Sequence, residues 1–219
     1  MSVNYLFFSS LWSGLAVWGA LYISDYVFTL TCARLYQSGV KEKIAFEGSF
    51  EITPYFQSDI DSLRVVSPRF LAAMALACGY LGAIWWLAGI SDARVYQFVL
   101  GSMILSELAI HVRHLRNLFL FRAILSTNGI QGRMQYARPS MLRMSAVELF
   151  AFAGLYAFLF LFTFSWFVLG GVFSCFSLGV KHRSLAKKHS SAALAEAPSV
   201  QMGEPAAGHS NSVSLDSGQ

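Results

Sequence analysis

Charged residues are scarce in this sequence: Asp, Glu, Lys and Arg make up 13% of its 219 residues, about half the fraction of an average soluble domain. This composition argues against an ordinary water-soluble enzyme. The formal net charge is only +4, and the basic residues do not form a concentrated stripe, so we expect no nucleic-acid partner. A hydrophobic content of 55% is too high for disorder over most of the chain. We therefore predict a polytopic integral membrane protein.

Cysteine is also rare. The three cysteines, Cys32, Cys78 and Cys175, lie far apart in apolar surroundings and form no Cys-x-x-Cys pair. This spacing does not support a disulfide framework or a zinc ribbon. Lysine and arginine are missing before the first apolar run, which begins at Leu6, although a secretory signal has them there. We therefore expect this run to stay in the mature protein.

Long apolar runs, by contrast, are abundant. A helix needs about 20 apolar residues to cross the hydrocarbon core of a bilayer, and the sequence offers this length four times. We predict an all-α fold, a four-helix transmembrane bundle with an amphipathic juxtamembrane segment. The membrane domain is expected to cover residues 1–189 and to be followed by a disordered polar tail, 190–219. The predicted spans cover about residues 6–32, 69–90, 94–118 and 144–179.

The fourth of these runs has an unusual length. It is too long for one helix perpendicular to the membrane, yet too short for two spans and a turn. We therefore predict a single helix that is tilted or interrupted at Gly170-Gly171.

The juxtamembrane segment, residues 37–67, carries local secondary-structure signals. Alternating apolar and polar residues around Gly48 predict a short hairpin within residues 43–53. Thr53-Pro54 and Ser67-Pro68 each place an N-capping residue before a proline suited to the first turn of a helix. We expect the first pair to open an amphipathic helix in the headgroup plane and the second pair to open span two.

Lysine and arginine are unevenly distributed between the connections. The loops after spans one and three contain most of them. The positive-inside rule therefore places these two loops in the cytoplasm and both termini outside. By the same rule, the basic cluster after span four, between Lys181 and Lys188, favours a cytoplasmic location for the C-terminal end of that span. We expect the protein in a bacterial inner (plasma) membrane.

Three carboxylates lie within the predicted spans at similar depths. Counting along each helix from the nearest arginine of the basic loops puts Asp25, Glu107 and Glu148 about 7 to 13 Å from the basic side of the membrane. A charged group that faces lipid is costly. We therefore expect the three carboxylates to face the bundle interior, where they meet one another, a cation or water.

Span three adds two histidines to these carboxylates. At about 100° per residue, His111 and His114 fall within about 40° of Glu107, so the three residues share one narrow face of the helix. Arg113 and Arg116 are expected to project from the opposite side. Span three is thus predicted to have an acid and imidazole face and a separate guanidinium face.

The polar cluster of Asp25, Glu107, His111, His114 and Glu148 has three interpretations. The first is a buried network of ion pairs and hydrogen bonds that fixes helix packing. The second is a site that relays protons or holds a cation, because desolvated carboxylates and imidazoles can titrate near neutral pH. The third is a metal site in which Glu107, His111 and His114 bind iron, zinc or manganese, and Asp25 and Glu148 complete the coordination sphere.

The loop after span three is strongly basic, with no Asp or Glu between Val112 and Arg143. This bias is the positive-inside signal itself, but guanidinium groups also bind phosphate oxygens through two parallel hydrogen bonds. We predict that Arg113, Arg116 and Arg122 bind the phosphate groups of anionic lipid headgroups.

These features favour a non-enzymatic membrane protein that handles an ion, a proton or a small solute, or that acts as a subunit of a larger membrane complex. Two alternatives stay open. One is a membrane-embedded metalloenzyme that uses the Glu107, His111 and His114 face, and the other is a structural scaffold or assembly factor. Four spans alone make a narrow pathway, so we expect a homo-oligomer or a partner membrane subunit.

Overall fold

The computed structural model describes residues 10–127 and 132–196. The start of predicted span one and the predicted tail beyond residue 196 lie outside these residues. The described chain is mostly helical, and four helices are long and apolar enough to cross a membrane. They overlap the four predicted spans and are α2 (Leu11–Leu35), α5 (Pro68–Ser91), α6 (Ala93–Thr127) and α7 (Arg138–Thr163).

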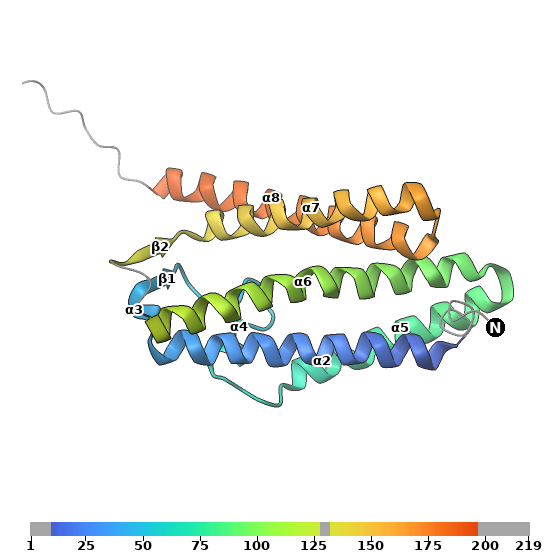
Figure 1. Cartoon of the computed structure of the whole chain (residues 1–219), viewed down its shortest axis with the longest axis horizontal. Coiled ribbons are helices and arrows are strands. Elements are labelled where there is room, and N and C mark those ends of the chain that lie inside the picture. Colours follow the sequence, from blue (N-terminus) through green and yellow to red (C-terminus); the bar gives the residue numbers. More distant parts are fainter. Residues whose placement is uncertain (1–9, 128–131, 197–219) are drawn as a thin grey trace, which may run out of the picture.

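The prediction of a single helix for residues 144–179 is wrong. α7 ends within this segment, the chain reverses, and a fifth long helix, α8 (Trp166–Glu196), runs back along α7 (Figure 1). Phe164 caps α7 in a left-handed conformation with φ 47°, and its N–H donates to the carbonyl of Phe160 at 2.8 Å. Glycine is the usual residue at such a cap, so a phenylalanine there leaves no signal in the sequence.

α8 also extends beyond the predicted membrane domain. Residues 190–196, expected to begin the disordered tail, form the end of this helix. The sequence there is rich in alanine, which has the highest helix propensity. Gly170 and Gly171 lie inside α8 and do not interrupt it.

The helices form two adjoining groups. α2, α5 and α6 make one group, and the α7–α8 hairpin makes the other, with α8 packed against both α6 and α7 (Figure 1). The α5–α6 and α7–α8 connections lie at one end of the molecule. Two short strands, β1 (Ile44–Phe46) and β2 (Met134–Tyr136), lie at the other end together with the end of α8 (Figure 1). α2 therefore begins and α8 ends at opposite ends of the molecule.

α6 and α8 approach each other closely because glycine leaves room between them. A Cβ atom on Gly101 of α6 would overlap the backbone of Phe167, and a Cβ atom on Gly170 of α8 would overlap the backbone of Phe98. Ser102 Oγ donates to the carbonyl of Gly170 across this contact at 3.0 Å. Close backbone contact at small residues is typical of helices packed within membranes.

The segment that follows α2 differs from its prediction. Instead of forming a hairpin within residues 43–53, β1 pairs in parallel with β2, and Phe46 lies opposite Tyr136. α2 leads into β1 through a π-helical turn, η1 (Tyr36–Val40), and a short helix, α3 (Lys41–Lys43). The partner strand comes from the loop before α7, so alternation within one segment could not identify it.

The predicted amphipathic helix is much shorter than expected. A turn at residues 54–56 leads into α4 (Gln57–Asp61), and Ile60 of α4 is buried among Tyr26 and Leu30 of α2 and Phe70 of α5. α4 thus packs on the bundle through its apolar side.

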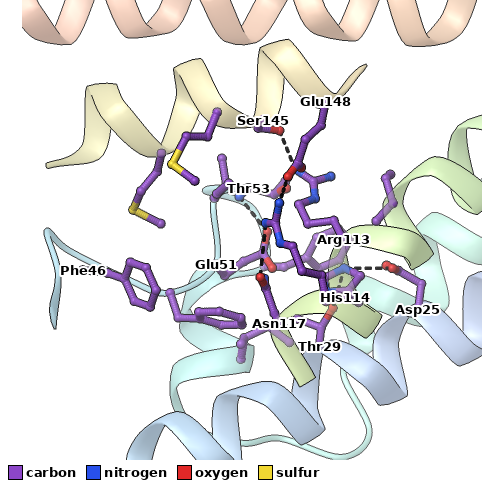
Figure 2. A pocket seen from close by; sticks show the side chains of 18 of the residues that line it. Asp25, Thr29, Phe46, Glu51, Thr53, Arg113, His114, Asn117, Ser145 and Glu148 are labelled. Atoms are coloured by element: carbon purple, nitrogen blue, oxygen red, sulfur yellow. Dashed lines mark hydrogen bonds and ion pairs between the residues drawn. The ribbon is translucent and has the colours of Figure 1, made fainter. Parts of the chain in front are cut away.

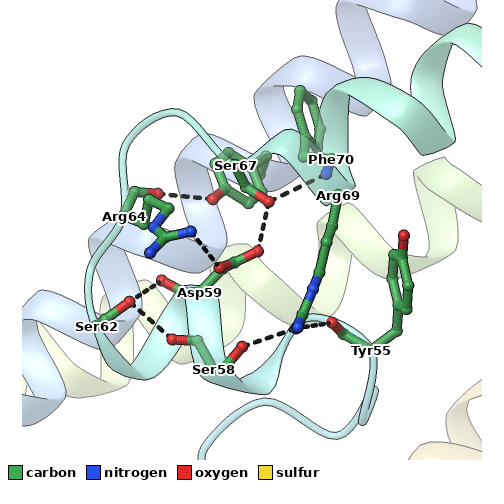
Figure 3. Close-up of polar contacts among 9 residues, drawn as sticks. Tyr55, Ser58, Asp59, Ser62, Arg64, Ser67, Arg69 and Phe70 are labelled. Atoms are coloured by element: carbon green, nitrogen blue, oxygen red, sulfur yellow. Dashed lines mark hydrogen bonds and ion pairs between the residues drawn. The ribbon is translucent and has the colours of Figure 1, made fainter.

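The second predicted cap is confirmed and contacts a buried carboxylate (Figure 3). α5 begins directly after Ser67, whose Oγ accepts from the N–H of Phe70 at 3.1 Å. The same hydroxyl donates to Asp59 Oδ2 at 2.6 Å, and Arg64 Nη1 lies 3.3 Å from Asp59 Oδ1. Asp59 therefore ties α4 to the first turn of α5.

Candidate functional site

A cavity of about 510 Å³ lies toward the β1–β2 end of the molecule, lined by α2, α6, α7, α8 and the loop after β1. Asp25, Glu107 and Glu148, the three carboxylates predicted at similar depths, all line it, and so does His114. His111 is buried beside the cavity, on the side of α6 that faces α2. Acids from three helices thus converge on one cavity.

His114 links α6 to α2 at the cavity wall (Figure 2). Its Nε2 makes an ion-pair contact of 3.0 Å with Asp25 Oδ1 and lies 3.3 Å from Thr29 Oγ1. His114 Nδ1 is fully buried and makes no hydrogen bond with any described residue. This nitrogen therefore has spare capacity for a water molecule or a ligand.

His111 is held in one orientation between α6 and α2. Its Nδ1 lies 2.7 Å from the carbonyl oxygen of Glu107, and its Nε2 lies 2.7 Å from Ser24 Oγ. The ring of Phe28 packs against the imidazole edge to face, with centroids 5.7 Å apart. Because a carbonyl oxygen only accepts, Nδ1 carries a proton in this arrangement, and Nε2 is paired with the Ser24 hydroxyl.

Three side chains of the cluster are close enough to share a cation. One ligand atom each from Asp25, Glu107 and His111 lie within 4.8 Å of one another. His114, the third member of the set predicted along span three, is not in this group and contacts Asp25 instead. The grouped residues come from two helices rather than from one face of α6.

The arginines of α6 face the same cavity as the acids. Arg113 donates to the hydroxyl of Ser145, and Arg116 forms an ion pair with Glu148 (Figure 2). The prediction of a separate guanidinium face, pointing away from the acids, is therefore wrong. The cavity extends around about half the circumference of α6 at 100° per residue, so long side chains from a wide arc of the helix reach it.

Arg113 and Arg122 have different surroundings. Arg122 is exposed and does not line the cavity. Arg113 lines it, and among the described residues no carboxylate forms an ion pair with Arg113. Its partner Ser145 also contacts Nδ1 of His182 at 2.8 Å. Arg113 is thus a cavity-lining cation that makes no direct ion pair in the described part of the chain, although the carboxylates of Glu51 and Asp25 act on it from a greater distance.

The polar residues of the cavity that were not predicted include Glu51, Ser145 and His182. Glu51 Oε1 accepts from the N–H of Thr53 at 2.7 Å, and burial raises the pKa of the Glu51 carboxyl above its ordinary value. No motif marks Glu51 as buried. Ser145 and His182 meet because α8 folds back along α7, and the turn that allows this has no signal in the sequence.

No protein-family model, curated protein or solved structure matches this chain. The cavity is therefore the feature of this chain that bears on its function. Its walls combine an acid and imidazole side around Asp25, a cationic side at Arg113, and apolar side chains from the loop after β1 and from α7. Such a cavity can hold an ion, a proton or an amphipathic molecule.

Proposed function

We propose that this chain is an integral membrane protein in which α2, α5, α6 and α7 cross the bilayer, α8 crosses back beside α7, and the β1–β2 end lies in the cytoplasm. The support is the distribution of positive charge. Because α8 returns to the β1–β2 end, its basic cluster, Lys181 to Lys188, joins the basic residues of the two loops there. All Lys and Arg residues fall within the described chain, and Arg94 alone lies at the opposite end. This distribution agrees with the positive-inside rule.

Within this protein, we propose that the cavity binds a small amphipathic solute carrying a phosphate or carboxylate group. The observation that carries this proposal is Arg113, a cavity-lining guanidinium that forms no direct ion pair among the described residues and is attracted by Glu51 and Asp25 only from farther away. A charge away from bulk water is costly unless it is paired. An anionic group on the solute supplies a direct counter-ion and matches the two parallel donors of a guanidinium.

The position of Arg113 along α6 suits the head of an amphipathic molecule. Nineteen residues, or about 28 Å of helix, separate Arg113 from Arg94 at the other end. The hydrocarbon core of a bilayer is about 30 Å thick. Arg113 therefore comes to the cytoplasmic boundary of the core, at the level of the lipid headgroups.

The apolar walls of the cavity suit the hydrocarbon part of the same solute. Phe46, Phe50 and Phe121 lie on one side, and Met141 and Met144 of α7 lie on another. Methionine side chains adapt to ligands of different shape because they are flexible and polarizable. The carboxylates of the cavity repel a second anionic group, so the proposed solute carries one.

Calorimetric titration of the full chain in a nonionic detergent tests this proposal. The probes are a short-chain phosphatidic acid, a fatty acid, inorganic phosphate, and a phosphatidylcholine with the same chains as the phosphatidic acid. We expect saturable binding of the two anionic amphiphiles. Arg113→Gln should weaken it about 10-fold or more, because a hydrogen bond to a charged group is worth about 1.5–3 kcal/mol. Arg122→Gln, an exposed arginine outside the cavity, is the matched control and should bind like the wild type.

The remaining probes define the solute. Inorganic phosphate binding as tightly as phosphatidic acid would identify a free phosphate as the solute. Arg113→Lys keeps the charge but loses the two parallel donors, so it should recover part of the affinity. Lack of saturable binding of any anionic probe to the wild type, or unchanged affinity in Arg113→Gln, would contradict the proposal.

A proton relay is a second candidate function, favoured by the contact between Asp25 and His114 at the cavity wall. Acid and imidazole chains of this kind mark proton pathways within membranes. Proteoliposomes that contain a pH-sensitive dye should then show proton flux above protein-free vesicles, and Asp25→Asn should lower the rate about 10-fold or more. Asp92→Asn, at the other end of the molecule, is the control. A wild-type rate equal to that of empty vesicles would exclude the relay.

A further inference from the structure

We propose that Asp25, Glu107 and His111 form a binding site for a divalent transition-metal ion at the wall of the cavity. One ligand atom from each of the three side chains lies within 4.8 Å of the others. Two carboxylate oxygens and one imidazole nitrogen form a ligand set that suits iron, manganese or zinc better than magnesium or calcium, which prefer oxygen alone. The proposal goes beyond solute binding at Arg113 and does not depend on it.

The orientation of His111 is the first observation in support. Its Nδ1 is paired with the carbonyl oxygen of Glu107 at 2.7 Å, and Phe28 packs against the edge of the ring. Nε2 lies 2.7 Å from Ser24 Oγ, and this hydroxyl also donates to the carbonyl oxygen of Leu21, so Nε2 can turn from Ser24 to a metal ion while the hydroxyl keeps a partner. Metal-binding histidines are held in the same way, by a bond from the other ring nitrogen to a carbonyl or carboxylate oxygen.

A buried carboxylate oxygen without a partner is the second observation. Glu107 Oε2 is fully buried and accepts no hydrogen bond from any residue that the structure describes. Asp25 Oδ1 is buried as well and lies 3.0 Å from His114 Nε2. Two carboxylates within a few ångströms of each other repel unless a cation or a proton lies between them. A metal ion bound by Asp25, Glu107 and His111 removes this repulsion.

The surroundings of the proposed site are the third observation. His114 Nε2 contacts Asp25 Oδ1 at 3.0 Å and orients this carboxylate from outside the ligand group. Asp25 and Glu107 also line the cavity, so an ion held there faces the space available to a solute. Three protein ligands leave coordination positions for water or for a group of the solute, as in catalytic rather than structural metal sites.

Metal binding by the purified full chain tests the proposal. After treatment with a chelator, the protein in detergent is incubated with Zn²⁺, Mn²⁺ or Co²⁺ in turn, passed through a desalting column and analysed for bound metal. We expect one ion per chain, with Glu107→Gln and His111→Ala each lowering the affinity at least 10-fold. His189→Ala is the matched control, because His189 is exposed on α8 and far along the chain from the cluster. Glu148→Gln controls for loss of a cavity carboxylate outside the ligand group.

X-ray absorption spectroscopy of the Zn²⁺- or Co²⁺-loaded wild type identifies the atoms that coordinate the metal, so it tests the proposal without any variant. We expect one imidazole nitrogen together with oxygen ligands. His114→Ala should weaken binding about 10-fold, the effect of losing an outer partner, and should leave the imidazole signal in place. Less than stoichiometric metal in the wild type, a spectrum without imidazole, or unchanged affinity in His111→Ala would each overturn the proposal. A wild type that binds the metal but no amphiphile would leave it standing and would refute the solute proposal alone.

Discussion

Replacing Gly101 by leucine is expected to separate α8 from α6 and to lower the free energy of unfolding by about 3 kcal/mol or more. A Cβ atom at Gly101 would overlap the backbone of Phe167, which cannot rotate away as a side chain can. Overpacking typically costs 1–3 kcal/mol where side chains and backbone can adjust, so a direct clash with the backbone should reach or exceed the upper limit. Thermal or denaturant unfolding of the purified protein in detergent measures the change.

A second glycine provides the matched control for this substitution. Gly154 lies in α7, and a Cβ atom there would meet no atom within 4 Å. Gly154→Leu should therefore keep or slightly raise the stability, because leucine has a higher helix propensity than glycine. Equal stability of the Gly101→Leu and Gly154→Leu variants would contradict the close contact between α6 and α8.

Local signals in the sequence account for the parts of the fold that were predicted. Apolar length alone locates the four candidate spans, because the thickness of the hydrocarbon core fixes the number of helical residues required. The start of α5 follows from Ser67-Pro68, since the hydroxyl cap and the fixed φ of proline act within one turn. The common depth of Asp25, Glu107 and Glu148 follows from the constant rise of a helix.

Features that depend on distant contacts could not be predicted in this way. The left-handed residue at the α7–α8 turn is Phe164, and tertiary packing rather than residue type holds it there. The pairing of β1 with β2 joins segments that are far apart in the sequence, so neither strand indicates the other. Missing the turn at Phe164 also concealed His182 and reversed the expected position of the basic cluster of α8.

In the candidate site, the depth of each side chain along its helix could be predicted, but the neighbour that it faces could not. Helical periodicity placed His111 and His114 on one face with Glu107, and both histidines contact α2, yet only His114 lines the cavity. A difference of a few tens of degrees decides whether a side chain reaches the cavity, and only the packing of the other helices settles it. Arg113 was expected on the side away from the acids, but it lies within the arc of α6 that the cavity covers.

Reversing the charge of Glu148 is expected to destabilise the contact between α6 and α7. Glu148 pairs with Arg116 and lines the cavity together with Arg113, so Glu148→Lys brings three cations together there. Breaking a buried ion pair costs about 3–5 kcal/mol, whereas an exposed pair is worth less than about 1 kcal/mol. The two side chains are 26% and 50% exposed, so we expect an intermediate loss of about 2 kcal/mol in the free energy of unfolding.

Exchanging the acid and the base of the Arg116–Glu148 ion pair separates this electrostatic effect from a loss of packing. The double variant Arg116→Glu, Glu148→Arg keeps one acid and one base across the same contact, and it should recover most of the stability that Glu148→Lys loses. Glu42→Lys, at an exposed acid on α3, makes the same change of net charge away from the cavity and should be nearly neutral. If the double variant is no more stable than Glu148→Lys, the shape of these side chains rather than their charge holds α6 against α7. Arg116 would then be free to bind an anion alongside Arg113.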